Sequence, residues 1–245
     1  MTRQYKRAPI TEAVIEIRIE PALPDAVVDQ LHRKLKTSYP LSKRTAKVGV
    51  HVNIEEKQTK IEAEEKGYRL SNTDGTDVVV VTSSAFSHSR LAPYLGWEQL
   101  RGLAEEEWQT WKRAVGYKKI SRIGVRFINR IDIPAKRGSK VLIEDYLRLY
   151  PQVPENGSIP SLNHYTMQVA AEVTEIEGII VVNSGSVASP LVDHSSFVLD
   201  LDISRQTNIP QNDKDLWAFV ETIRSFKNSV FEMCITDKSR EIFDS

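Results

Sequence analysis

The residues of this chain best suited to binding an anion are three arginines on one predicted strand. Arg122, Arg126 and Arg130 lie in the segment 122–133, where apolar and polar side chains alternate. A period of two is typical of a strand with one buried face, so the three guanidinium groups share the opposite face. Successive arginines are then about 13 Å apart. That distance exceeds one phosphate spacing, so cations from adjacent strands would have to fill the gaps in a nucleic-acid site.

The same arginines have an internal alternative. Acidic residues occupy the polar faces of two other predicted strands, Glu12, Glu16 and Glu20 on one and Asp200 and Asp202 on the other. Cross-strand pairing with these acids would neutralise the arginines within the sheet. Aromatic side chains suited to base stacking are missing from the arginine face, which argues against recognition of single strands. Anion binding and internal pairing both remain open on the sequence.

His88 and Arg90 form a second candidate anion site. We expect them in a linker between a strand and the helix that begins at Trp97. The N-terminus of a helix attracts anions because its N–H groups are unpaired and its dipole is positive there. The alternative is a structural linker, anchored in the core by apolar neighbours such as Phe86 and Tyr94.

No arrangement of residues predicts catalysis, and we expect no cofactor. Asp200 and Asp202, two apart on a strand, come nearest to a Mg²⁺ site, but a third acidic ligand and a phosphate loop are missing. The run 193–195 (Asp-His-Ser) is better explained as a turn, because triad residues must converge from separate elements. P-loop, GxGxxG, HExxH and Cys/His metal motifs are absent. Cys234, the single cysteine, is expected to be a buried small hydrophobe.

The composition is ordinary for a globular protein, and the net charge predicts no long-range electrostatic attraction to nucleic acids or anionic membranes. The 245 residues include 33 basic and 33 acidic side chains, for a formal net charge of zero. Two windows, 30–54 and 108–131, contain basic residues and no acid, and acids gather at 55–65 and 105–107. No apolar run approaches the ~20 residues of a membrane span, and the N-terminus is polar. These features favour a cytoplasmic protein without a membrane partner.

The pattern of the chain predicts two similar halves. In the first, strands at 12–20, 46–55, 57–65, 68–72 and 78–82 accompany helices at 24–38 and 97–115, with an Asp74-Gly75 hairpin. In the second, strands at 122–133, 164–175, 178–188 and 197–204 accompany helices at 141–149 and 213–233, a turn at Asn156-Gly157 and a terminal helix capped by Thr236.

These elements predict an α+β fold. Strands joined by hairpins pair mostly antiparallel, and a helix with one apolar stripe must cover a sheet. We expect one or two curved, mostly antiparallel sheets, backed by helices on one face. The strand–helix–strands–helix order suggests a pseudo-duplication into halves 1–118 and 119–245, which form one continuous unit.

Four stretches carry a resemblance to a known family. They are 5–12, 86–94 with Trp97, the arginine strand, and 217–243, including Lys227-Asn228. Together they resemble an uncharacterised, sporadically distributed prokaryotic family of about this length, which has no established activity. Such a distribution resembles that of horizontally transferred genes, and so implies a mobile element, a defence system or a toxin–antitoxin pair.

Two classes of function follow. The first is a non-enzymatic binding or regulatory protein with a protein partner, for which nucleic acid and a second copy are alternative partners. The second is a metal-assisted enzyme or binder of a phosphorylated or nucleic-acid substrate. In that case His88, Arg90, Arg122, Arg126 and Arg130 bind the anion, and Asp200 or Asp202 holds the metal. The lack of a catalytic arrangement favours the first.

Overall fold

The computed structural model describes residues 3–53, 58–136, 141–152 and 164–245, with the side chains of 46–65 left out. The side chains of the acidic stretch at 55–65 and the whole of the Asn156-Gly157 turn therefore lie outside what is described. The same holds for the side chains of the basic window beyond Thr45.

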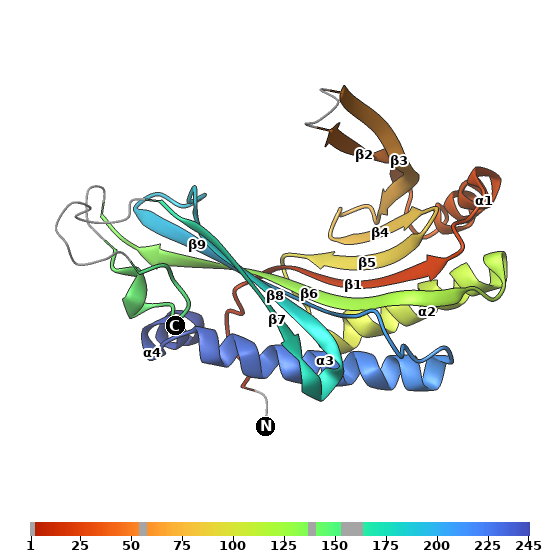
Figure 1. The fold of residues 1–245 in the computed structure, drawn as a ribbon. Helices are drawn as coiled ribbons and strands as arrows, with labels where there is room; N and C mark the ends of the chain where they lie inside the picture. Colours follow the sequence, from red (N-terminus) through yellow and green to blue (C-terminus); the bar gives the residue numbers. More distant parts are fainter. Residues whose placement is uncertain (1–2, 54–57, 137–140, 153–163) are drawn as a thin grey trace. The chain divides into compact units, whose positions relative to one another are not determined.

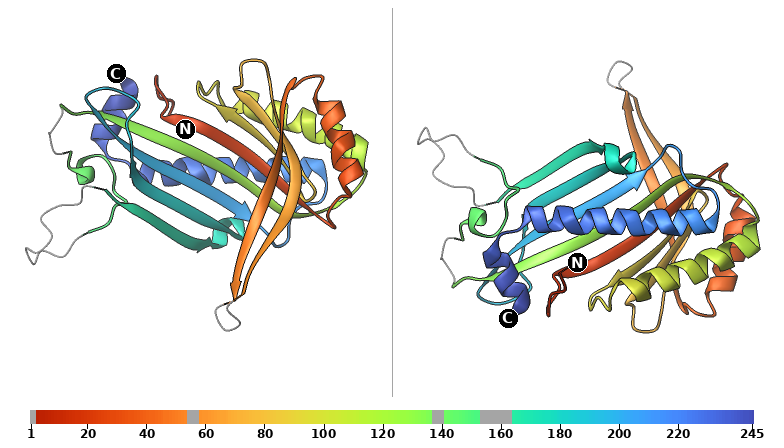
Figure 2. Two further views of the ribbon diagram at one scale, coloured as in Figure 1. Left: turned by 90° about the horizontal axis from the view of Figure 1, so that it is seen from above. Right: turned by 90° about the horizontal axis from the view of Figure 1, so that it is seen from below.

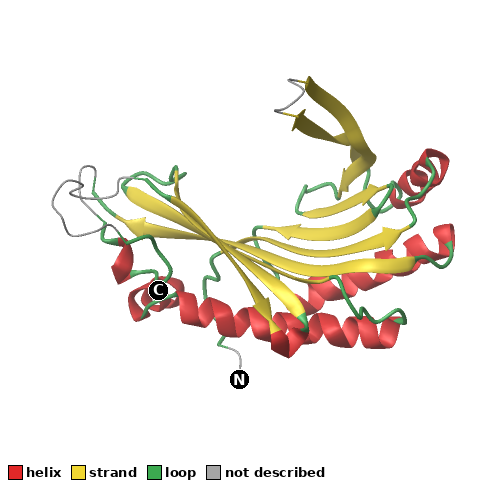
Figure 3. Cartoon of the chain, in the orientation of Figure 1, coloured by secondary structure: helices red, strands yellow, loops and turns green. Residues whose placement is uncertain are grey.

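The described residues form a nine-stranded antiparallel sheet with helices, which confirms the α+β prediction (Figure 1). The strand order is β2-β3-β4-β5-β1-β6-β9-β8-β7. The strands are β1 (Ile10–Glu20), β2 (Leu41–Asn53), β3 (Gln58–Ser71), β4 (Asp77–Thr82), β5 (Ala85–Leu91), β6 (Lys119–Pro134), β7 (Thr166–Val173), β8 (Gly178–Val187) and β9 (His194–Arg205). The helices are α1 (Asp25–Leu35), α2 (Trp97–Val115), α3 (Asp213–Cys234) and α4 (Asp237–Asp244), with 3₁₀ turns η1 (Ile143–Asp145) and η2 (Thr174–Ile176), as coloured in Figure 3.

The chain divides into two compact units. Unit A comprises residues 14–123, and unit B comprises 1–13 with 124–245. The change from one unit to the other falls within β1 and within β6. The division into halves at 118/119 stays a prediction, since no separate folding of either part is shown.

Unit A packs its helices through the stripes expected from the sequence. On β1, the alternating residues Ile15, Ile17 and Ile19 are buried, as a half-buried strand requires. Trp108 of α2 stacks on Trp111 with ring centroids 4.7 Å apart, and it meets Phe86 of β5 at 5.8 Å. These aromatic side chains supply much of the apolar area of the core.

Unit B is built around the alternating strand predicted at 122–133. Val125, Phe127, Ile131 and Ile133 of β6 are buried, and so are the odd-numbered leucines of β9. Helix α3 covers this apolar face with a stripe that includes Leu216, and it runs beside β9 while β7 stays at the margin of unit B (Figure 2, right).

Several predicted elements were wrong. The linker after 82 contains strand β5. The strands predicted at 57–65 and 68–72 are one strand, β3. Gly67 lies between the two predicted strands, and its missing side chain permits close pairing, since a Cβ would lie 2.4 Å from the Val81 carbonyl oxygen. The helix at 141–149 is a single 3₁₀ turn. Thr236 is the N-cap residue of α4, yet its hydroxyl donates to the Asp145 carbonyl and does not cap the helix.

Trp111 is 1% exposed, so its removal tests the core of unit A. We expect Trp111→Ala to lower the free energy of unfolding by about 3–5 kcal/mol, through lost transfer energy and the cavity left behind. Tyr117→Ala is the control, because Tyr117 is 76% exposed and its loss should change stability by less than about 0.5 kcal/mol. Chemical denaturation of both variants measures the difference. Equal stability of the two would show that the stripe of α2 does not hold the core together.

Candidate functional site

His88 and Arg90 lie on strand β5, and the prediction that they occupy a loop at a helix N-terminus was wrong. His88 is opposite Val79 in the β4–β5 ladder and is fully buried, and Arg90 is 7% exposed. The segment was mistaken for a linker because its polar residues 87–90 hide the strand pattern. The side chains of His88 and Arg90 find their partners inside unit A, on β4, α2 and the segment after β5.

His88 belongs to a cluster of four buried ionisable side chains, held by one hydrogen bond to Glu107 and an electrostatic contact with Asp77, which in turn binds Arg90. Its Nδ1 lies 2.7 Å from Oε2 of Glu107 on α2. Its Nε2 lies 3.8 Å from Oδ1 of Asp77, and the other oxygen of Asp77 accepts a 2.7 Å bond from Arg90. Arg90 also donates to the carbonyl of Pro93 at 3.1 Å. Asp77 therefore neutralises the positive charge of Arg90, and the burial of Arg90 keeps it from contact with a ligand in solvent.

Burial decides where the protons of this network reside. It raises the pKa of Glu107 to about 9, and it lowers the pKa of His88 to about 4. At neutral pH a protonated Glu107 then donates to Nδ1, which leaves the hydrogen of His88 on Nε2, directed at Asp77. Nε2 of His88 and Oδ1 of Asp77, 3.8 Å apart, are too far from each other for a hydrogen bond, and neither has a hydrogen-bond partner among the described residues. The network as a whole is electrically neutral, as a low-dielectric interior requires.

The arginine strand is paired internally. In unit A, Arg122 donates to Glu16. In unit B, Arg126 forms a two-pronged pair with Asp200, at 2.8 and 2.7 Å, and this hydrogen bonding raises the pKa of Arg126. Arg130 binds Asp132 at 3.0 Å. Two of the three partners, Glu16 and Asp200, belong to the acids expected from the sequence, and Asp132 is a neighbour on the same strand.

The pair formed by Arg126 and Asp200 belongs to a ladder of polar side chains that crosses unit B. The amide of Asn183 on β8 donates to Asp200 at 3.0 Å. Gln168 on β7 donates to Asn183 at 2.7 Å. This row fixes the side chains on one face from β6 to the last strand, β7. Asp200 is consequently used as an acceptor in the sheet.

The acidic residues considered for metal binding or catalysis do not form a cluster in the described part of the chain. No group of three or more His, Cys, Asp or Glu side chains suited to a metal ion occurs there. In the Asp-His-Ser run, Nδ1 of His194 is 2.7 Å from the carbonyl oxygen of Val192, and β9 begins at His194. Cys234 is buried, as predicted, and burial raises its pKa.

Two buried charged residues were not anticipated. Glu107 lies within the apolar stripe of α2, and Lys227 lies within that of α3. Nζ of Lys227 is 3.8 Å from the ring centroid of Phe127, and burial lowers its pKa to about 7. A charged residue at core spacing on an amphipathic helix is the signal that could have identified both.

A groove of about 350 Å³ in unit A lies against α1 and β3. Its polar groups already pair with one another. The hydroxyl of Tyr68 donates to Asp29 at 2.6 Å and accepts from Arg44 at 3.2 Å, while the ring of Tyr68 stacks on His32. A ligand would have to displace these bonds, so the groove is a poor binding site.

Strand β7 has an outer edge whose backbone groups are not paired with another described strand. This strand ends the sheet, and no other described strand pairs with its outer edge. The N–H of Ser186 donates to the carbonyl of Tyr165 at 3.0 Å, which fixes the phase of the β7–β8 ladder. Backbone groups alternate in direction along an antiparallel strand. Odd-numbered residues of β7 therefore bond to β8, and Thr166, Gln168, Ala170 and Glu172 direct their N–H and C=O groups outward.

The side chains of β7 are exposed on both faces. Val169 lies opposite Val182 on the face that α3 covers elsewhere, yet it is 40% exposed. Ala171, on the same face, is exposed too, while the opposite face carries Gln168 and Glu172. A strand with an apolar face, a polar face and a free edge can accept another strand.

The shared proton of His88 and Glu107 predicts a pH dependence of stability. The raised pKa of Glu107 stabilises the fold below pH 4.5, and that stabilisation is lost as the pH rises toward 9. The lowered pKa of His88 stabilises the fold above pH 6.5, and that stabilisation is lost as the pH falls toward 4. The two effects cancel between about 4.5 and 6.5. Above 6.5, unfolding should become easier by about 1.4 kcal/mol per pH unit up to about pH 9.

Glu107→Gln should remove this decline, because glutamine can still donate to Nδ1 but cannot titrate. Urea denaturation at several pH values between 6.5 and 9 measures the slope for the variant and the unmodified protein. Glu106→Gln is the matched control on the exposed side of α2 and should keep the slope of the unmodified protein. The same slope in the Glu107 variant would contradict a proton held by this pair.

The pairing of Arg126 predicts a loss of stability when its charge is removed. Asp200 is 4% exposed, so Arg126→Gln leaves a buried carboxylate short of donors and should cost about 1–3 kcal/mol. Asp200→Asn in the same chain should recover part of the loss. Lys119→Gln, at an exposed position of β6, is the control and should cost less than about 0.5 kcal/mol.

Binding to generic RNA and DNA, measured at several salt concentrations, separates the two roles of Arg126. An anion-binding role would leave the stability of Arg126→Gln unchanged and reduce the salt slope by about one unit. That outcome would overturn the internal role.

Comparisons with known proteins do not identify a family. No protein-family model matches the chain, and no curated protein matches it at a significant level. The family resemblance therefore stays a prediction. In the described part of the chain, no helix has both the length and the apolar character needed to cross a membrane. The function has to be argued from the side chains and strands described above.

Proposed function

We propose that the chain is a non-enzymatic protein-binding module that pairs a partner's strand with the outer edge of β7. The observation that carries the proposal is the run of outward backbone groups at Thr166, Gln168, Ala170 and Glu172, on a strand exposed along both faces. Addition of a strand to such an edge satisfies these groups and gives affinity through main-chain hydrogen bonds.

The state of the charged residues supports binding over catalysis. His88 and Arg90 are buried in a neutral network, and Arg126 and Arg130 each hold a carboxylate. An enzyme or binder acting on phosphorylated or nucleic-acid substrates would have to break these pairs first. The ladder that ends at Gln168 instead orders side chains beside the proposed edge.

The setting of this function rests on the sequence alone. From the resemblance at 5–12, 86–94 and 217–243, we propose a partner encoded by a mobile element, a defence system or a toxin–antitoxin pair. We also expect the protein to act in the cytoplasm.

Ala170 offers a direct test, because its N–H points outward and its side chain is exposed. Ala170→Pro deletes that donor without breaking a bond to β8, and proline is tolerated at such edge positions. A partner captured by the unmodified protein from its native cell would be purified and titrated against each variant. We expect Ala170→Pro to weaken Kd at least about tenfold, equivalent to about 1.4 kcal/mol.

Ala170→Ser is the matched control, because it keeps the N–H and should bind as tightly as the unmodified protein. Ala171→Pro removes a donor directed at β8, so it should lower the thermal midpoint, whereas Ala170→Pro should not. Equal partner binding by Ala170→Pro and Ala170→Ser would refute the proposed edge.

A further inference from the structure

We propose that a second copy of this chain occupies the β7 edge, so that two β7 strands pair antiparallel about a twofold axis. This inference rests on the proposed function and names its partner. Three features of unit B favour this pairing: the direction of the backbone groups, the pattern of exposed side chains, and the distribution of charge along β7.

The backbone fixes the registers that are allowed. Residues that direct their backbone groups outward must lie opposite outward residues of the other copy, which are the even-numbered ones. A twofold axis at Val169 satisfies this rule and places Thr166 opposite Glu172 and Gln168 opposite Ala170. All four outward residues of each copy are then hydrogen-bonded within the described length of β7.

Side chains match in the same register. Directly opposed residues of an antiparallel pair lie on the same face of the sheet. Val169 therefore meets Val169 of the second copy, and Met167 meets Ala171, on the apolar face. The contact buries Val169, which is 40% exposed beside the core of unit B. The partner strand has to offer an apolar face and a polar face in alternation, and β7 itself does.

The charges permit self-pairing. Glu172 is the one charged residue of β7, and in this register it faces Thr166 and not its own counterpart. Natural edge strands are commonly protected from self-association by lysine, proline or a bulge. Strand β2, at the other end of the sheet, carries Lys43 and Arg44, whereas β7 has no basic residue and no proline. This contrast between β2 and β7 favours β7 as the edge at which a second copy pairs.

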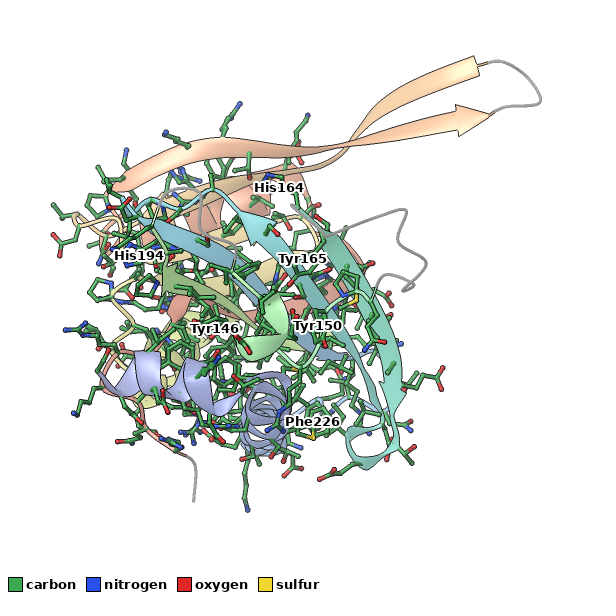
Figure 4. The ribbon with its side chains drawn as sticks, turned by 90° about the vertical axis from the view of Figure 1, so that its left-hand side faces the viewer. Tyr146, Tyr150, His164, Tyr165, His194 and Phe226 are labelled. Atoms are coloured by element: carbon green, nitrogen blue, oxygen red, sulfur yellow. The ribbon has the colours of Figure 1, made fainter. Side chains whose placement is uncertain are left out.

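The neighbouring groups leave the edge accessible among the described residues. Tyr165, labelled in Figure 4, precedes β7, and its ring stacks on Phe197 while its hydroxyl bonds to Ser184. It is thus directed over β8 and β9 and away from the outer edge. One strand pair is smaller than a typical stable interface, so the association should be weak and concentration-dependent.

The first test is sedimentation equilibrium of the full chain up to about 1 mM. We expect a monomer–dimer equilibrium with a Kd on the order of micromolar to hundreds of micromolar. Ala170→Pro should remain monomeric throughout this range, and Ala170→Ser should dimerise normally. A monomer at all concentrations, or a dimer that persists in Ala170→Pro, overturns the proposal.

The second test reads the register and does not depend on the proline variant. Val169→Cys places two thiols opposite each other at a non-hydrogen-bonded position, within the Cα separation of about 4.4–6.8 Å that a disulfide needs. It should give a covalent dimer under mild oxidation. Glu172→Cys is equally exposed, but its two thiols would be about 20 Å apart, so it should stay monomeric. The unmodified chain, with Cys234 buried, is the blank. Equal cross-linking of both variants, or of Glu172→Cys alone, overturns the register.

The two proposals fail in distinguishable ways. If the chain is monomeric but a different protein binds it, and that binding is lost in Ala170→Pro, the second copy is refuted and the strand-pairing function stands. If Ala170→Pro changes neither self-association nor any other binding, both are refuted.

Discussion

Desolvation of charge is the constraint on which the arrangement of this protein depends. A charged side chain that loses water must find a partner or lose its charge. Arg90 is held by Asp77, and His88 shares one proton with Glu107. The same rule fixes how α2 packs on β5 in unit A, because Glu107 has to reach His88. His88 and Arg90, which resemble an anion site in the sequence, are buried in the fold and interact with Glu107 and Asp77.

Unit B obeys the constraint differently. The ion pair of Arg126 and Asp200 lies on the sheet face opposite α3, where the side chain of Arg126 stays 46% exposed while that of Asp200 is nearly covered. The pair is therefore partly solvated, so its electrostatic attraction contributes little to the free energy of folding. Its main effect is to fix the orientation of the two side chains. It orients Asp200 toward Asn183, and Asn183 toward Gln168. A row of hydrogen-bonded side chains therefore extends from β6 to β7, the strand with the unpaired outer edge.

Strand edges and charged side chains pose the same physical problem. A backbone N–H without a partner needs water or another chain, as a buried carboxylate needs a donor. In this protein the side chains are largely satisfied within each unit, whereas the outer backbone of β7 is not satisfied by any described strand. The function proposed above therefore relies on main-chain pairing and not on side-chain chemistry. An interface of this kind leaves little trace in a sequence, because it depends on main-chain hydrogen bonds that every residue except proline can make.

The sequence by itself determined those strands and helices in which apolar residues recur with the period of the element. The alternation at 122–133 predicted β6, and the spacing of Trp97, Trp108 and Trp111 predicted α2 to the residue. It also showed that Asp200 could pair with an arginine. Periodicity works there because one face of each element is apolar and the other is polar, so local sequence and tertiary burial agree.

Only the tertiary structure decided the rest. β5 was missed because buried His88 and Arg90 look like solvent-exposed loop residues until Glu107 and Asp77 are placed beside them. The strands predicted at 57–65 and 68–72 became one strand only because β4 pairs closely with it at Gly67. The phase of β7, and hence which of its backbone groups face outward, depends on its ladder with β8, to which the bond from Ser186 to Tyr165 belongs. In each case the deciding partner is distant in sequence, and no local pattern encodes the identity of a long-range neighbour.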